Sequence, residues 1–295
     1  MPGCSQTKGK LFWIVSYPKS GNTWMRSFIY ALQNEGVNKI DINAIQTGSI
    51  ASQYDWVANG LGFDIDELPA QEVDRLRPKA YRFISDNLTA FGYHKVHDAQ
   101  YAVSKQEVLF PADATKGVLL IVRNPLDIAV SFAHHLGVDI DTSIVRMADK
   151  DFGLASRVKG RSIQLRQKLL SWSGHVQSWR RTDLPVCMLR YEDMLALPLA
   201  TFKTAARFLR LPADTQRVSR ALELCRFEGF QNQEQNCGFI EKSPKASAFF
   251  RKGIVGDWRN VLSVSQVDRI IEAHGEVMAT LGYLDGDGKL TQLCG

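Results

Sequence analysis

Short apolar runs alternate with longer amphipathic segments along the chain, which predicts an α/β fold with a mostly parallel central sheet and helices on both faces. Two local observations support this fold class. The run Gly117–Val122 is continuously apolar, as is typical of a strand buried on both faces of a parallel sheet. It is followed by Asn124 and Pro125, which together indicate a helix start, because Asn caps a first turn and Pro is favoured at its first position.

The same reasoning gives an expected order of elements for the whole chain. Strands are expected at residues 11–16, 91–96, 117–122 and 185–189. Helices are expected at residues 22–35, 125–135, 163–180, 198–210, 214–225 and 265–281, and residues 227–262 are expected to be loop-rich. We expect residues 1–295 to form a single domain, since α/β domains reach this size. Ligands of such sheets bind beyond the carboxyl ends of the strands, so the loops 17–23 and 123–125 are predicted to border the ligand site.

Composition and charge exclude several classes of protein. With 45% hydrophobic residues and 23% charged residues, the chain is not expected to be disordered. The longest apolar runs, 11–15 and 118–122, are far shorter than the ~20 residues of a membrane-spanning helix. The net charge of +5 is spread without a basic tract. It favours a small anionic ligand over a nucleic acid, although a slightly basic surface is equally compatible with it.

Cysteine usage points to a reducing compartment. The five cysteines are an odd number, no pair forms a CxxC motif, and the run 11–15 is too short for a signal-peptide core. We therefore expect a cytoplasmic protein with reduced thiols and no zinc site. Cys187 lies in an apolar run and is expected in the core.

The first candidate site is the loop Tyr17–Trp24, which leaves a strand and opens a helix. Gly21 allows a tight turn, and the first N–H groups of the helix attract an anion. The loop adds the ammonium of Lys19 and polar side chains at Ser20, Asn22 and Thr23. This combination favours a phosphate cradle over an ordinary capped helix start.

This loop is not a Walker A motif, in which the lysine follows the last glycine. Here Lys19 precedes Gly21, and the strand 117–122 ends at Arg123, where nucleotide hydrolases of the P-loop class place a metal-holding aspartate. The pattern therefore predicts an anion held by cations, without an obligatory metal.

Two further segments are rich in cations and hydrogen-bond donors. Arg123–Ser131 begins with an arginine at a strand end, which can bind a phosphate through two hydrogen bonds. Arg251–Arg259 contains adjacent cations and two glycines, the composition of a positive loop that can close over a phosphate. Three such segments indicate a ligand with more than one anionic group.

These segments resemble the motifs of the cytosolic-type sulfotransferases, which use 3′-phosphoadenosine-5′-phosphosulfate (PAPS). Tyr17–Trp24 is similar to the family's Y-P-K-S-G-T-T-W loop, Arg123–Ser131 to its 3′-phosphate motif, and Arg251–Trp258 to its R-K-G-x-x-G-D-W motif. Tyr191-Glu192-Asp193 is similar to its Y-E-D sequence. The matches occur in family order over residues 11–263, and they imply a P-loop-like fold and a PAPS-dependent transferase.

The resemblance also implies a role for each matching position. Lys19 would contact the oxygen between phosphate and sulfate, and residues 20–23 would cradle the 5′ groups. Trp24 would stack on the adenine, Tyr191 would contact the adenosine end, and Phe227 would line the base. The 3′-phosphate would be held by Arg123, Ser131, Arg251, Lys252 and Gly253.

His97 is the candidate general base, because Lys95-Val96-His97 resembles the family's K-T-H and a neutral imidazole can accept the acceptor's proton. Lys95 would stabilise charge on the transferring sulfuryl group. Lys19 and Ser131 complete the expected catalytic set, and Asp98 is a less favoured base.

Some positions depart from the family pattern, and some questions stay open. Asn22 and Val96 replace threonines, and residues 259–268 are only chemically similar to the family's dimer segment, so a homodimer through this segment is a hypothesis. The acceptor is expected to be a small molecule bound between segments 37–65 and 135–162, and it accepts the sulfuryl group on a hydroxyl or possibly an amine. A P-loop kinase or nucleotide hydrolase, and a non-catalytic nucleotide-binding protein, are the alternatives.

Overall fold

The computed structural model describes residues 9–155 and 164–292. Within them a parallel sheet has the strand order β2-β1-β3-β6. Its strands are β1 (Leu11–Ser16), β2 (Gly92–Val96), β3 (Thr115–Val122) and β6 (Val186–Arg190). A two-stranded antiparallel pair, β4 (Gly153–Leu154) and β5 (Gln167–Lys168), lies apart from it. The predicted parallel sheet is confirmed.

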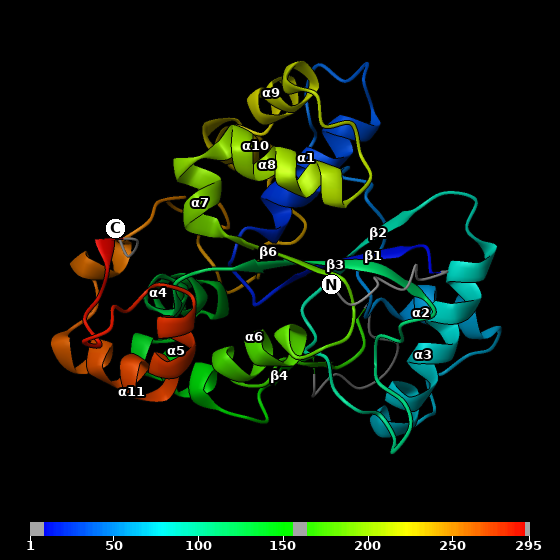
Figure 1. Cartoon of the computed structure of the whole chain (residues 1–295), viewed down its shortest axis with the longest axis horizontal. Coiled ribbons are helices and arrows are strands. Elements are labelled where there is room, and N and C mark those ends of the chain that lie inside the picture. Colours follow the sequence, from blue (N-terminus) through cyan, green and yellow to red (C-terminus); the bar gives the residue numbers. More distant parts are fainter. Residues whose placement is uncertain (1–8, 156–163, 293–295) are drawn as a thin grey trace.

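Helices cover both faces of this sheet (Figure 1). One face carries α1 (Asn22–Gln33), α7 (Tyr191–Ala196), α8 (Pro198–Phe208), α9 (Thr215–Leu224) and α10 (Phe227–Cys237). The other carries α2 (Tyr54–Leu61), α3 (Ala70–Asn87), α4 (Pro125–Leu136), α5 (Ile140–Ala148), α6 (Trp172–Arg180) and α11 (Val264–Thr280). A short 3-10 helix, η1 (Asp257–Asn260), forms at the end of the third cationic segment. The predicted α/β class, with helices on both faces, is confirmed.

The central strand β1 divides the interior into two hydrophobic cores. Successive side chains of a strand point to opposite faces. Trp13 and Val15 therefore pack into the core under α2, α3, α4 and α6, whereas Phe12 and Ile14 pack into the core under α1 and α8. All six residues of β1 are buried. This double burial explains why the run carries no polar alternation.

Two expected elements are wrong. The helix expected at 163–180 begins only at Trp172, because Ser171 caps it by accepting a hydrogen bond from the Gly174 N–H. Residue 163 lies outside the described residues. The expected loop-rich segment 227–262 contains α10 and η1. The sequence of α10 is rich in Gln, Asn and Glu and buries only Phe230 and Glu234, so its apolar periodicity is weak.

Helices α2, α3, α5 and α7 were not expected either, and Cys187 is only half-buried at the edge of the core. The described residues Cys187, Cys225 and Cys237 are free thiols, and the other two cysteines lie outside the described ranges. Among the helices of the described ranges, none combines the length and apolarity that a membrane crossing needs.

The parallel arrangement brings four chain segments to one edge of the sheet. The loop 17–21 follows β1, His97 follows β2, Arg123 follows β3 and Tyr191 follows β6. Carboxyl ends of parallel strands meet at the same edge, as the sequence analysis expected for the ligand site.

A buried carboxylate attaches the third cationic segment to this edge. Asp127, in the first turn of α4, is 1% exposed and accepts hydrogen bonds from the N–H groups of Gly256 (2.8 Å) and Trp258 (3.1 Å). The position of residues 251–258 beside the sheet therefore depends on α4, which the Asn124 cap starts.

We expect Asp127→Ala to lower the free energy of unfolding by about 1–3 kcal/mol for each of the two buried N–H groups left without an acceptor. Urea unfolding followed by circular dichroism measures this loss. Asp268→Ala, at an exposed carboxylate on α11, is the matched control. An alanine variant as stable as the original chain would contradict the structural role of Asp127.

Candidate active site

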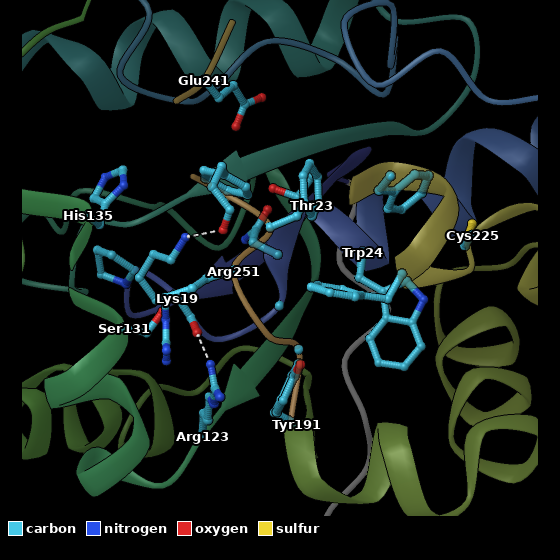
Figure 2. Close-up of a pocket in the computed structure, with 18 of the residues that line it drawn as sticks. Lys19, Thr23, Trp24, Arg123, Ser131, His135, Tyr191, Cys225, Glu241 and Arg251 are labelled. Atoms are coloured by element: carbon cyan, nitrogen blue, oxygen red, sulfur yellow. Dashed lines mark hydrogen bonds between the residues drawn. The ribbon is translucent and has the colours of Figure 1, made fainter. Parts of the chain in front are cut away.

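One cavity of about 1220 Å³ opens at the carboxyl edge of the sheet. Most of the residues selected from the sequence line it, namely Lys19, Gly21, Asn22, Thr23, Trp24, Lys95, His97, Arg123, Ser131, Tyr191, Phe227, Arg251, Lys252 and Gly253. Ser20 is not among the lining residues and is fully buried. The structure therefore brings together segments that are more than 200 positions apart in the sequence (Figure 2).

The loop after β1 turns through unusual backbone conformations. Lys19 has φ of 69° and Gly21 has φ of 99°, both in the left-handed region. A Cβ atom on Gly21 would lie 2.9 Å from the ring of Tyr191, so a side chain has no room there. Strained non-glycine residues cluster at functional sites, and here the strain places Lys19 at the cavity wall.

The Lys19 ammonium lies among aromatic and carbonyl groups rather than beside a carboxylate. Its Nζ donates to the carbonyl of Phe249 (3.3 Å) and lies 3.7 Å from the centre of that phenyl ring. Burial lowers the pKa of Lys19 to about 7, and the nearby cation of Arg123 adds to this effect. Such a lysine gains charge stabilisation when an anion enters the cavity.

Arg123 connects two of the three cationic segments. Its Nη1 donates to the Lys19 carbonyl (2.9 Å) and its Nη2 to the Ile254 carbonyl (2.9 Å). The guanidinium also lies 4.3 Å from the centre of the Tyr191 ring. Its Nε atom is buried and has no hydrogen-bond partner among the described residues.

The third cationic segment carries its own carboxylate. Arg251 and Lys252 both form ion pairs with Asp257, which is 2% exposed. These two pairs help to lower the pKa of Asp257 against the effect of its burial. Lys252 keeps 46% of its side chain exposed, so the pair still presents positive charge to the cavity.

Aromatic rings line the part of the cavity away from Lys19. Trp24 packs edge-on against Tyr191, with ring centres 6.2 Å apart, and Phe227 lies under Gly253. A Cβ atom on Gly253 would lie 2.7 Å from the Phe227 ring. This end offers flat apolar surfaces of the kind that stack on a planar ring.

Several polar atoms of the first loop are buried without a hydrogen-bond partner within the described ranges. They are Tyr17 Oη, Ser20 Oγ, Asn22 Oδ1 and Trp24 Nε1. The amide nitrogen of Asn22, expected as a ligand donor, instead donates to the carbonyl of Ile14 (2.8 Å) and to Ser16 Oγ (3.2 Å). Asn22 therefore fixes the end of β1 and leaves its oxygen unpaired.

His97 is held in one tautomer by the backbone. Its Nδ1 lies 2.7 Å from the Ser16 carbonyl. Because a carbonyl only accepts, Nδ1 carries the proton and Nε2 keeps its lone pair. Burial and the cation of Lys95 hold the pKa of His97 well below its usual value, so the ring is neutral at pH 7.

The Asp98 carboxylate does not line the cavity. It is 1% exposed and forms a two-point ion pair with the fully buried Arg77, at 3.1 and 2.9 Å. Trp179 Nε1 donates to the Asp98 carbonyl (3.1 Å), and His175 Nε2 lies 3.2 Å from the His97 carbonyl. Asp98 therefore anchors the turn that carries His97.

The end of the cavity opposite the rings of Trp24 and Phe227 is lined by a mixture of apolar and polar side chains. It is lined by Ile50, His135, Leu154, Ala155, Gln164, Gln167, Ile240, Glu241 and Phe249. Segments 37–65 and 135–162 thus contribute as expected, although residues 156–162 lie outside the described part of the chain. The aromatic residues Tyr54, Trp56, Phe63 and Phe152 are not among the lining residues.

Sequence reasoning missed Glu241, Phe249 and His135, and it quoted Asp257 within a motif without giving it a role. The segment that contains Glu241 and Phe249 has no repeat, glycine pattern or charge run to select it. Within the described ranges there is no group of three or more His, Cys, Asp or Glu side chains that could hold a metal ion.

Known proteins are similar to this chain over most of its length. A family model described as "Sulfotransferase domain" matches residues 10–282. Sulfotransferase 2A1 of Rattus norvegicus is 27% identical over 274 residues, which cover 90% of this chain and 84% of the relative. Cytosolic sulfotransferase 17 of Arabidopsis thaliana is 26% identical over 289 residues, which cover 92% and 75%.

Solved structures show the same fold. A mouse sulfotransferase, SULT7A1, complexed with PAP, matches with a TM-score of 0.57 and 18% identity over 97% of this chain and 88% of its own. Retinol dehydratase in complex with androsterone and inactive cofactor PAP matches with a TM-score of 0.59 and 18% identity, covering 93% and 82%. Because the family model spans most of the sequence, this chain belongs to the sulfotransferase family.

Proposed function

We propose that this chain, acting as a single domain, transfers the sulfuryl group of PAPS to a hydroxyl, or possibly an amine, of a small-molecule acceptor, with His97 as the general base. One observation carries the proposal. The cations Lys19, Arg123 and Arg251 and the neutral imidazole of His97, which come from four different segments, line the same cavity.

The residues present fit the donor. PAPS has anionic groups at both ends of an adenosine, and the cavity has cations on two loops with aromatic rings beside them. The buried Nε of Arg123, which no described residue bonds, supports an anionic ligand at this position. Gly253, with a φ in the left-handed region, lets the third cationic segment pack directly against the Phe227 ring.

The donor, when bound, supplies a sulfuryl group on a phosphate leaving group. On this proposal, Lys19 and the loop N–H groups after it bind the 5′ groups, because an ammonium and a helix start both attract anions. Arg123, Ser131, Arg251, Lys252 and Gly253 bind the 3′-phosphate. Trp24, Tyr191 and Phe227 contact the adenine.

His97 accepts the acceptor's proton at Nε2. The Ser16 carbonyl holds the proton on Nδ1, so the lone pair at Nε2 is available throughout the physiological range. The positive charge that forms on the ring is next to Lys95, so the proton is not retained after transfer. Lys19 and Lys95 stabilise the negative charge that develops around the reacting sulfur.

The acceptor is proposed to bind at the mixed end of the cavity. Ile50, Leu154 and Phe249 offer apolar contact, and Gln164 and Gln167 offer hydrogen bonds. The retinol dehydratase structures contain androsterone or retinol, which supports a small acceptor with an apolar body for this chain as well.

A homodimer through residues 259–268 is a further proposal about partners. This segment joins η1 to the start of α11 and exposes Val261 (41%) and Val264 (78%). Two apolar side chains at one exposed turn support a self-contact in which they would be covered.

We expect the chain to transfer labelled sulfate from PAPS to at least one member of a panel of phenols, sterols, primary alcohols and amines. In such an assay His97→Ala should lose about 10²–10⁴-fold in turnover, the usual contribution of a general base. Calorimetry with 3′,5′-diphosphoadenosine should show nearly unchanged nucleotide binding. Parallel losses of turnover and binding would mean that His97 has a structural role only.

We expect nucleotide affinity to fall as the pH rises through about 7. Lys19 has its pKa lowered to about 7 by burial, so the free protein loses this ammonium above that pH. An anionic ligand binds the charged form better, so it raises the pKa of Lys19, and binding above about pH 7 is accompanied by proton uptake. Titration calorimetry with 3′,5′-diphosphoadenosine between pH 6 and 9 tests this expectation. Lys19→Arg, which stays charged, should remove the pH dependence; a slope equal to that of the original chain would contradict the assignment.

We expect Val264→Glu to shift the oligomeric state toward the monomer while the far-UV circular dichroism spectrum stays unchanged, because the position is exposed in the single chain. Light scattering at micromolar concentration measures the mass of both proteins. A monomeric original chain would remove the dimer proposal.

A further inference from the structure

Glu241 is one of the carboxylates that line a cavity rich in cations. Its Oε1 lies 2.7 Å from Arg26 Nη1, and its Oε2 lies 2.8 Å from Lys95 Nζ. In Figure 2 its side chain lies at the top of the view, above Lys19 and Thr23. The Glu241 side chain is 26% exposed, whereas that of Lys95 is 15% exposed and that of Arg26 is 8% exposed. Within this cluster Glu241 is therefore the most open toward the cavity, and Arg26 is the most buried.

The segment that carries Glu241 contacts both lysines of the proposed mechanism. Glu241 bonds Lys95, and eight positions later Phe249 contacts Lys19 through its carbonyl and its ring. The start of this segment is fixed by Asn43, whose side chain donates to the Gly238 carbonyl (3.1 Å) and accepts from the Ile240 N–H (2.9 Å). The position of Glu241 is therefore built into the fold.

The charges around Lys95 explain what the carboxylate does. Burial lowers the pKa of Lys95, and Arg26 from α1 adds a second opposing effect, whereas Glu241 raises the pKa. His97, Lys19 and His135 also face Lys95 from the other sides of the cavity, and none of them is an anion. Among these groups Glu241 alone stabilises the ammonium.

We propose that Glu241 is a positioning residue, which holds the Lys95 ammonium at the reacting end of the cavity and stays paired with it while the donor is bound. This inference rests on the proposed function. Glu241 takes one of the three N–H bonds of the ammonium, which leaves two for a sulfuryl oxygen. Arg26, Lys95 and Glu241 together remain positive, so an anion is still attracted. The competing interpretation is that Glu241 is a placeholder: it pairs with Lys95 only while the cavity is empty, and the sulfuryl group of PAPS displaces it.

The charge of Lys95 can be measured without knowing the acceptor. In a chain labelled with ¹³C-lysine, the Lys95 signal is the one absent from Lys95→Arg. We expect this signal to titrate at lower pH in Glu241→Gln than in the original chain, both alone and with PAPS bound. Identical titrations without ligand would overturn the proposal, and a difference that disappears when PAPS binds would establish the placeholder instead.

Turnover with PAPS and 2-naphthol gives the second measurement. At low pH, Glu241→Gln should approach the rate of the original chain. As the pH rises the variant should lose activity, and the loss should approach about 10²–10³-fold, the usual cost of removing one donor to the transition state. Glu241→Asp should restore part of the alkaline activity, and Glu272→Gln, at an exposed carboxylate of α11, should behave as the original chain.

The two failures are distinguishable. An original chain that transfers no sulfuryl group from PAPS to any acceptor would refute the proposed function, while the lysine titration still reports on the Glu241–Lys95 pair. An active original chain with an equally active Glu241→Gln variant at every pH would refute this inference alone. A higher turnover in the variant, together with tighter PAPS binding, would also overturn it in favour of the placeholder.

Discussion

The arrangement of the cavity depends on the guanidinium of Arg123. It leaves the end of β3 and donates to the carbonyl of Lys19 on one side and to the carbonyl of Ile254 on the other, each at 2.9 Å. The loop after β1 and the loop after α10 are otherwise separate in the sequence by more than 200 residues. A single planar side chain thus fixes their spacing, as only a residue with several donors in a rigid plane can do. The same guanidinium still faces the cavity, so the group that builds the site is also available to a ligand.

Bringing several cations together in one cavity costs free energy, and the fold offsets this cost with carboxylates that pair directly with the cations. Asp257 pairs with Arg251 and Lys252, and Glu241 pairs with Lys95 and Arg26. Lys19 and Arg123 differ from these cations, since each of them contacts carbonyls and an aromatic ring instead. Burial lowers the pKa of Lys19, and the cation of Arg123 adds to this effect. The proposed mechanism places this lysine nearest to the bond that breaks.

A structural feature could be predicted from the sequence when the residues that determine it are close together in the chain. The apolar run of β3, the Asn124 cap and the loop around Gly21 are determined by neighbours in the chain, and the structure confirms the strand, the helix start and the turn. Parallel topology explains why the first two cationic segments meet at one cavity, whereas hydrogen bonds to Asp127 hold the third there. Glu241 and Phe249 could not be predicted, because their importance comes only from contacts with lysines more than 100 positions away. The helix expected at 163–180 was placed too early for a related reason. Its apolar periodicity extends to residues before Trp172, but the cap at Ser171 sets where the helix begins.

The neutral state of His97 follows from the same charge distribution. A histidine beside cations in a buried site has its pKa lowered, which in isolation would make it a weak base. The Ser16 carbonyl compensates in part, because it bonds the proton on Nδ1 and strengthens as that nitrogen becomes more positive. On the proposed mechanism, such a base takes the proton only when the attacking group has become acidic through its bond to sulfur, so proton transfer and sulfuryl transfer would be coupled. Lys19 and Lys95 would set this coupling through their charge, and Glu241 through its ion pair with Lys95.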